Sequence, residues 1–221
     1  MNPSIVIGAT LAPFAMSDPG VWGSWLRNPQ PHKYFAALEV DKRGRGVYQD
    51  MIEYNYEPLT HWTYHYGDGR EQVTSANRGR HIAMGRNMIF DFAIEYRADY
   101  VLMMDADVIL QDDTIPKLLE VVEETSVNVV GAYCPAFAMD GVREIDFPGD
   151  TRIHLATGCT LISSHVFTKL RYGPMDDWGF QADCLRFLNE YQYVRRDAVV
   201  PHFPDAIPPL EDRGYDLRMH Q

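Results

Sequence analysis

The stretch ADYVLMMDADVILQ, residues 98–111, sets the expected centre of the fold. Its run from Tyr100 to Met104 is continuously apolar, which predicts a strand buried on both faces within a mostly parallel sheet. Asp105 and Asp107 follow this strand directly. Because open α/β sheets bind ligands outside the carboxyl ends of their strands, we expect both carboxylates to lie where a ligand binds.

Oxygen ligands at this spacing suit Mg²⁺ or Mn²⁺, which keep coordination positions for water and for phosphate groups. The simpler interpretation is a solvated turn, because Asp is common where strands end. The apolar residues Val108, Ile109 and Leu110 beyond the pair favour the metal site. A metal at this position would imply a nucleotide or a phosphorylated substrate.

Length and composition indicate one globular domain. With 221 residues, 46% of them hydrophobic, the chain can bury a substantial core and is too apolar for disorder. The net charge of −11 argues against a generic basic surface for nucleic acids. Cys134, Cys159 and Cys184 are too widely spaced to indicate a zinc site or a disulfide framework. Since the start has no basic leader and no run is long enough to span a membrane, we expect a cytoplasmic protein.

Strands and helices alternate along the chain, which predicts the α/β class. Periodicity and turn residues predict strands at residues 4–11, 34–40, 61–66, 100–104, 127–133, 153–163 and 193–203. Helices are expected at residues 47–56 and 77–97, after a cap at Asp112 or Asp113, and at residues 180–191.

Apolar residues at three- and four-residue steps predict the buried faces of two of these helices. In the helix at 77–97 they are Ile82, Ile89, Phe92, Ala93 and Tyr96, with Arg86 outside this stripe. In the helix at 180–191 they are Phe180, Cys184, Phe187, Leu188 and Tyr191. Gly158, within an expected strand, is typical of a position that a ligand or another backbone approaches closely.

The order of these motifs resembles the GT-A glycosyltransferases of the family-2 type, which transfer a sugar from a nucleotide sugar. The pieces are GRN at residues 85–87, ADYVLMMDADV with its DxD motif, ATGCTLIS, the helix FQADCLRFLNEYQY and the strand ending in VVPHF. The resemblance implies one GT-A-like, Rossmann-type catalytic domain over residues 1–203, with helices flanking a mostly parallel sheet. Residues 204–221 would form a coil tail that packs on or near the active site.

The resemblance also implies roles for individual residues. Asp105, Asp107 and His202 would hold Mn²⁺ or Mg²⁺, and Asp105 would also contact the donor. Arg86 would reach the diphosphate or the sugar. The ends of the first three strands would surround the base and the ribose with Thr10, Glu39 and Asp68.

One departure from the family concerns the catalytic base. Many relatives have a Glu-Asp pair at the start of the helix before the last strand, whereas this chain has Phe180-Gln181. In an inverting reaction, which the resemblance favours, an acid deprotonates the acceptor hydroxyl. Asp183 is the first choice for this base and Asp177 or Asp176 the alternatives, while a retaining reaction would need no such base.

The function implied is a metal-dependent glycosyltransferase that moves a sugar from a nucleotide-sugar donor to an acceptor hydroxyl. The acceptor could be a glycan, a small molecule, a protein or a modified nucleic acid. VLMMDADVI also fits a phosphatase of the haloacid dehalogenase type, in which Asp105 would be the nucleophile. That motif normally opens its domain, however, and here several expected strands precede it. The third alternative is a nucleotide-sugar-binding module that has lost its catalytic base.

Overall fold

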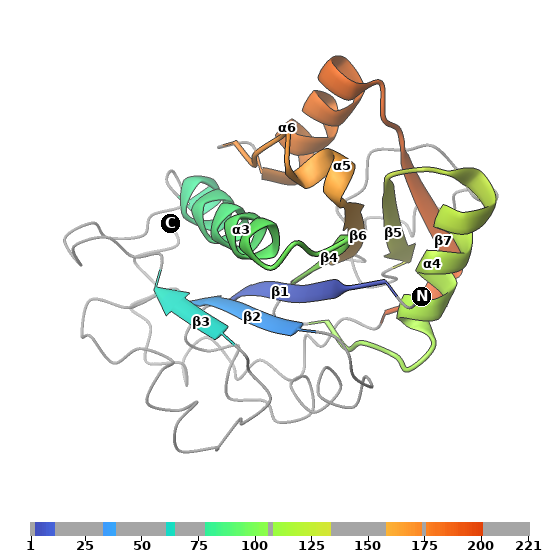
Figure 1. The fold of residues 1–221 in the computed structure, drawn as a ribbon, viewed down its shortest axis with the longest axis horizontal. Helices are drawn as coiled ribbons and strands as arrows, with labels where there is room; N and C mark the ends of the chain where they lie inside the picture. Colours follow the sequence, from blue (N-terminus) through green and yellow to red (C-terminus); the bar gives the residue numbers. More distant parts are fainter. Residues whose placement is uncertain are drawn as a thin grey trace, which may run out of the picture.

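The computed structural model describes residues 3–11, 33–38, 61–64, 78–105, 108–133, 158–173 and 176–200. They build a single α/β domain around a seven-stranded sheet in the order β3-β2-β1-β4-β6-β5-β7 (Figure 1). The strands are β1 (Ile5–Leu11), β2 (Lys33–Leu38), β3 (His61–Tyr64), β4 (Tyr100–Asp105), β5 (Val129–Tyr133), β6 (Cys159–Ser163) and β7 (Gln192–Val199). All neighbouring strands run parallel except the two pairs that contain β6, which confirms the α/β class and the mostly parallel sheet.

Helices cover both faces of this sheet. They are α3 (Arg78–Glu95), α4 (Thr114–Thr125), α5 (Ser164–Phe167), α6 (Asp176–Asp183) and the π-helix η2 (Cys184–Leu188). Figure 1 shows α3, α5 and α6 together on one side of the sheet. The helices predicted at 77–97 and after Asp112 or Asp113 are therefore confirmed as α3 and α4.

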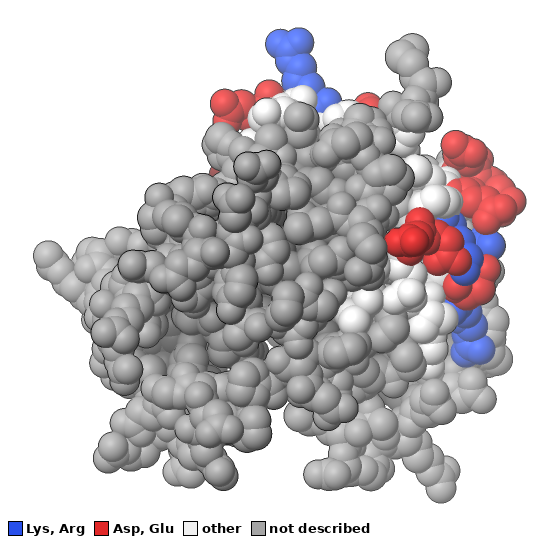
Figure 2. Space-filling model, turned by 90° about the horizontal axis from the view of Figure 1, so that it is seen from below, with Lys and Arg blue, Asp and Glu red and all other residues white. Residues whose placement is uncertain are grey.

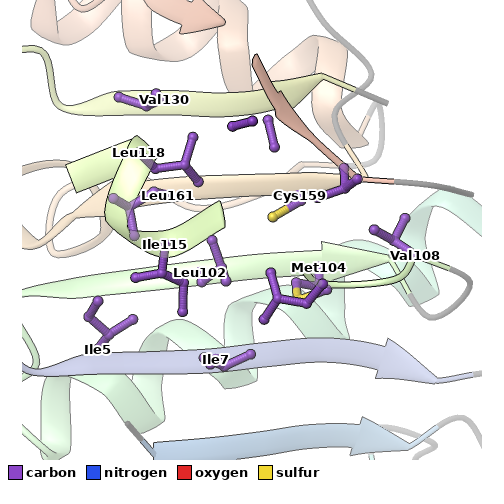
Figure 3. Packing of buried hydrophobic residues seen from close by; sticks show 14 of the residues in the cluster. Ile5, Ile7, Leu102, Met104, Val108, Ile115, Leu118, Val130, Cys159 and Leu161 are labelled. Atoms are coloured by element: carbon purple, nitrogen blue, oxygen red, sulfur yellow. The ribbon is translucent and has the colours of Figure 1, made fainter. Parts of the chain in front are cut away.

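Two hydrophobic cores lie on opposite faces of the sheet. On one face Ile5 of β1 and Leu102 of β4 pack against α4, as Figure 3 shows. On the other face Val6, which follows Ile5 in β1, and Val101, which precedes Leu102 in β4, pack against α3. Val6 and Val101 are paired in the register of the two strands. Successive residues of β4 are thus buried on alternate faces, because side chains of a strand alternate between the faces. This arrangement confirms the doubly buried strand expected at the centre of the sheet.

The register of the strands aligns their ends at one edge, which we call the carboxyl edge. Here β1, β2, β3, β4, β5 and β7 end, and β6 begins. Thr10 of β1 is paired with Asp105 of β4, and Tyr133 of β5 is paired with Val199 of β7. The carboxyl edge is therefore where the fold collects the polar residues that follow its strands.

The helix predicted at 180–191 differs from the observed one. It begins before residue 180, as α6, and its second half is the π-helix η2. Phe180 and Cys184 are buried as predicted, but Phe187 is 60% exposed and Tyr191 is exposed, so their predicted burial was wrong. A π-helix bonds each residue to the one five positions away and has a longer turn than an α-helix. The apolar residues of η2 therefore do not all continue the buried face of α6.

Tyr96, also predicted to be buried, is exposed, although its N–H still bonds Phe92 O and its ring packs against that of Phe92 with 4.6 Å between centroids. The helix predicted at 47–56 and the tail predicted at 204–221 lie outside the described residues, so the domain boundary after residue 203 stays a prediction. Within the described part of the chain, no helix has the length and apolar character needed to cross a membrane.

Charged side chains form ion pairs within α4 and its N-cap and between α4 and β7. Lys117 Nζ lies 2.8 Å from Asp113 Oδ2, and Arg195 Nη2 lies 3.0 Å from Glu120 Oε2. Figure 2 shows basic and acidic side chains interspersed at the right of the view, the side on which α4 and β7 lie in Figure 1. This part of the surface therefore has no excess of positive charge that would attract a nucleic acid.

Candidate active site at the carboxyl edge

Asp105 and Thr10 stand side by side at the carboxyl edge. Asp105 is the last residue of β4 and its side chain is 33% exposed, while Thr10 is its partly exposed partner on β1. Paired residues of adjacent strands project to the same face of a sheet and lie about 5 Å apart. The structure thus brings together two of the residues expected to contact the donor, on the face covered by α3.

Arg86 reaches this pair from α3. Its Nη2 donates a hydrogen bond to Asp105 Oδ1 at 2.9 Å, and only 3% of the residue is exposed. The prediction that Arg86 lies outside the buried stripe of its helix was therefore wrong. A guanidinium can be buried when it is paired and hydrogen-bonded, and the Asp105 carboxylate meets both conditions. A contact of Arg86 with a diphosphate or a sugar stays a prediction.

Gly158 holds the backbone of Asp105 from the neighbouring strand. Asp105 N donates a hydrogen bond to Gly158 O at 2.7 Å, and Val108 N lies 3.4 Å from Asp105 O. A Cβ at Gly158 would lie 2.6 Å from Val108 Cγ2 and 3.6 Å from Asp105 Oδ2. Gly158 is therefore closely approached, but by the side chain of Val108, in the segment that carries Asp105, where a ligand or another backbone was expected.

Tyr172 forms the support on which Arg86 lies. The guanidinium carbon of Arg86 is 5.0 Å from the centroid of the Tyr172 ring. The same ring stacks on Phe180 of α6, with 4.2 Å between centroids. Asn87, next to Arg86 on α3, accepts a hydrogen bond from Tyr172 N at 2.8 Å and donates one to Tyr172 O at 3.0 Å.

Tyr172 and Asn87 were missed by the sequence analysis. Asn87 belongs to the GRN motif, so its position beside Arg86 was a usable signal. Tyr172 is 85 residues further along the chain and lies in no motif, and its role becomes visible only when the two segments pack together.

The acids of α6 lie at opposite ends of that helix. Asp183 is its last residue and is partly exposed. It precedes Cys184, whose thiol pKa is raised to about 12 by burial and by the charges of Glu190 and Asp183. Glu190 Oε1 accepts a hydrogen bond from Asn128, the residue before β5, so this end of α6 points toward the edge opposite Asp105. Asp177 is at the other end of α6, which follows the segment that carries Tyr172.

The side chain of Asp177 lies outside the described residues. The assignment of the base to Asp183 or Asp177 therefore stays a prediction. Along the chain, Tyr172, whose ring faces Arg86, comes shortly before the start of α6, where Asp177 lies.

Four predicted site residues lie outside the described part of the chain: Glu39, Asp68, Asp107 and His202. Glu39 follows the last residue of β2, and Asp107 is two positions after Asp105, the last residue of β4. Both of these strands end at the carboxyl edge. Among the described residues no group of three or more His, Cys, Asp or Glu side chains could hold a metal ion. The metal centre therefore stays a prediction that depends on Asp107 and His202.

Comparison with known proteins finds a family model that matches part of the chain. Residues 63–148, which include Arg86 and the DxD motif, match the model of glycosyl transferase family 2. No curated protein matches the sequence.

Solved structures share the fold at low sequence identity. TarS from S. aureus, residues 1–349, superposes with a TM-score of 0.63 and 11% identity, over 90% of this chain and 60% of TarS 1–349. Its complex with UDP-GlcNAc gives a TM-score of 0.57 at 12% identity, over 90% of this chain and 58% of that one. A197 from STIV gives 0.52 at 13% identity, over 91% of this chain and 86% of A197. The solved structures show a shared fold, and the glycosyl transferase family 2 model matches residues 63–148 within it.

Proposed function

We propose that this chain is a metal-dependent glycosyltransferase that moves a sugar from a nucleotide-sugar donor to an acceptor hydroxyl. The observation that carries the proposal is the ion pair between the buried Arg86 and the partly exposed Asp105 at the carboxyl edge. Burying a charge costs free energy, so the presence of a buried ion pair is not explained by a gain in stability. It lies where α/β sheets bind their ligands, within the residues that match the glycosyltransferase model.

The proposed donor is a nucleoside diphosphate sugar, with uridine as the first base to test. TarS, whose fold this chain shares, was solved with UDP-GlcNAc and with UDP. Thr10, Glu39 and Asp68 lie near the ends of the first three strands in the sequence and would surround the base and the ribose.

Asp105, Asp107 and His202 would hold Mn²⁺ or Mg²⁺. The described ligand fits this role, because a carboxylate has two oxygens and about four acceptor sites, so Asp105 can bind Arg86 and still offer an oxygen to a cation. His202 is two residues beyond Val200, whose N–H is bound to Tyr133 O near the end of β5. β7 is three strand spacings from β4, about 14 Å, so the chain after Val200 would have to turn back along the edge. A bound metal would neutralise the charge that develops on the leaving diphosphate.

Arg86 supports the reaction by holding the Asp105 carboxylate in place before the donor arrives. Groups that are already oriented stabilise a transition state without reorganisation during the reaction. In an inverting transfer, Asp177 or Asp183 would take the proton of the acceptor hydroxyl. The course of α6 favours Asp177, because the helix begins shortly after Tyr172 and ends near Glu190.

Calorimetry with UDP and Mn²⁺ tests the binding part of this proposal. We expect metal-dependent UDP binding in the wild type and its loss in Asp107→Ala, with the unfolding midpoint retained because Asp107 follows a strand end. Equal affinities in the two proteins would refute the metal assignment.

Hydrolysis of nucleotide sugars without an acceptor tests the chemistry. Slow release of UDP from one donor supports a transferase, whereas binding without any release or transfer supports a non-catalytic module. Hydrolysis of p-nitrophenyl phosphate that depends on Asp105 would instead support the phosphatase.

A further inference from the structure

Tyr172 connects Arg86 to α6. Its ring is stacked on that of Phe180, with an angle of 15° between the planes and 4.2 Å between the centroids. Phe90 of α3 packs against both rings, at 5.4 Å from Tyr172 and 5.8 Å from Phe180. The Arg86 guanidinium lies 5.0 Å from the Tyr172 ring, so the ring that faces this cation is itself held by two aromatic neighbours.

Asn87 holds the backbone of Tyr172. It binds both the N–H and the C=O of that residue, at 2.8 and 3.0 Å, as an adjacent strand would do. Because Asn87 and Arg86 are consecutive on α3, the helix fixes the guanidinium and the ring that faces it together. The buried ring, the guanidinium and the Asp105 carboxylate thus form a continuous series of contacts from α6 to the carboxyl edge.

We propose that Tyr172 is a positioning residue for sugar transfer, which orients Arg86 and, through it, the Asp105 carboxylate toward the donor. The inference rests on the proposed function, and it requires no contact between Tyr172 and substrate. The aromatic ring is the essential part of the side chain, because the attraction to the guanidinium comes from the π-electrons of the ring. Tyr172→Phe should therefore preserve the effect and Tyr172→Leu should remove it.

Phe167→Leu is the matched control for Tyr172→Leu. Phe167 is buried in the same aromatic cluster and stacks on Phe90, with 5.7 Å between centroids. Its replacement removes an aromatic ring from the same core without removing the ring that faces Arg86. Asn87→Ala is a second test variant, since it removes both hydrogen bonds to the backbone of Tyr172 and keeps the aromatic side chain of that residue.

The first measurement needs no donor. Hydrogen exchange of the Arg86 Nε–H group is followed by NMR, with the signal assigned by its absence in Arg86→Lys. We expect slow exchange in the wild type, in Tyr172→Phe and in Phe167→Leu. Exchange should be faster by on the order of tenfold in Tyr172→Leu, where a desolvated cation–π contact is lost. The exchange of Arg86 Nε–H should also be faster in Asn87→Ala, but by a smaller factor. If Tyr172→Leu does not fold, the exchange rate in Asn87→Ala tests the positioning role of Tyr172.

The second measurement is donor turnover per folded molecule. Tyr172→Leu should lower kcat by about 10- to 100-fold, since small misplacements of reacting groups have effects of this size. Tyr172→Phe should stay near the wild type, and Phe167→Leu should lose stability without a comparable loss of kcat.

Two results would overturn the positioning role: unchanged Arg86 exchange in Tyr172→Leu, or equal losses of kcat in Tyr172→Leu and Phe167→Leu. A wild-type protein that neither binds nor turns over any nucleotide sugar would contradict the proposed function instead. In that case the donor-free exchange data would still decide whether Tyr172 orients Arg86.

Discussion

Replacing Gly158 by alanine tests whether β6 fixes the segment that carries Asp105. The added Cβ would lie 2.6 Å from Val108 Cγ2, about 1 Å closer than the roughly 3.5–4.0 Å at which carbon atoms normally pack. Val108 has no exposed surface into which it could turn, so the backbone has to move. Overpacking of this kind costs about 1–3 kcal/mol of stability. Since Gly158 O accepts the hydrogen bond of Asp105 N, the same movement should displace Asp105 from Arg86.

Urea unfolding measures the loss of stability, and calorimetry with UDP and Mn²⁺ measures the loss of affinity. Gly173→Ala is the matched control, because a Cβ there meets no atom within 4 Å. It should leave affinity unchanged and stability equal or higher by up to about 1 kcal/mol. Gly8→Ala is a second control, since its Cβ would lie 2.4 Å from Ile89 Cγ2, in the core between β1 and α3.

Gly158→Ala should weaken UDP binding beyond what its loss of stability accounts for, whereas Gly8→Ala should lose stability with UDP binding largely kept. Wild-type stability and affinity in Gly158→Ala would refute the close approach at this position. Equal losses of affinity in Gly158→Ala and Gly8→Ala would refute a specific link between Gly158 and the site.

Three further predictions concern the metal, the base and a buried thiol. His202→Ala should weaken Mn²⁺ binding while changing the unfolding free energy little, and equal metal titrations for variant and wild type would exclude His202 as a ligand. Asp177→Asn should lower turnover by about 10²–10⁴-fold with donor affinity intact, the range for loss of a general base. Asp183→Asn should stay close to the wild type, and the reverse result would assign the base to Asp183. The Cys184 pKa is raised from 9.0 to about 12, so the folded chain retains a proton that the unfolded chain loses between these pH values. The unfolding free energy should therefore fall as pH rises from about 9 toward 12, and urea titrations of Cys184→Ala should show a smaller fall, a result contradicted by equal slopes.

Local patterns were sufficient for most of the fold. The continuous apolar run before Asp105 predicted β4, because a strand buried on both faces needs apolar side chains at every position. The periodicity of residues 77–97 predicted α3 for a similar reason, with Ile89 and Ala93 buried as expected. Asp105 could be assigned to the carboxyl edge because a strand end is a local property of the sequence.

Interactions between distant segments were needed for the rest. Periodicity counts Arg86 as polar, yet it is buried because Asp105, 19 residues further on, neutralises it. Tyr172 meets Asn87 across 85 residues, and no local pattern records that contact. The antiparallel direction of β6 is seen only in its pairing with β4 and β5, since a strand's own residues do not encode the direction of its neighbours. Local sequence can specify an element and its buried face, but the partners of a buried charge are specified only when the elements pack.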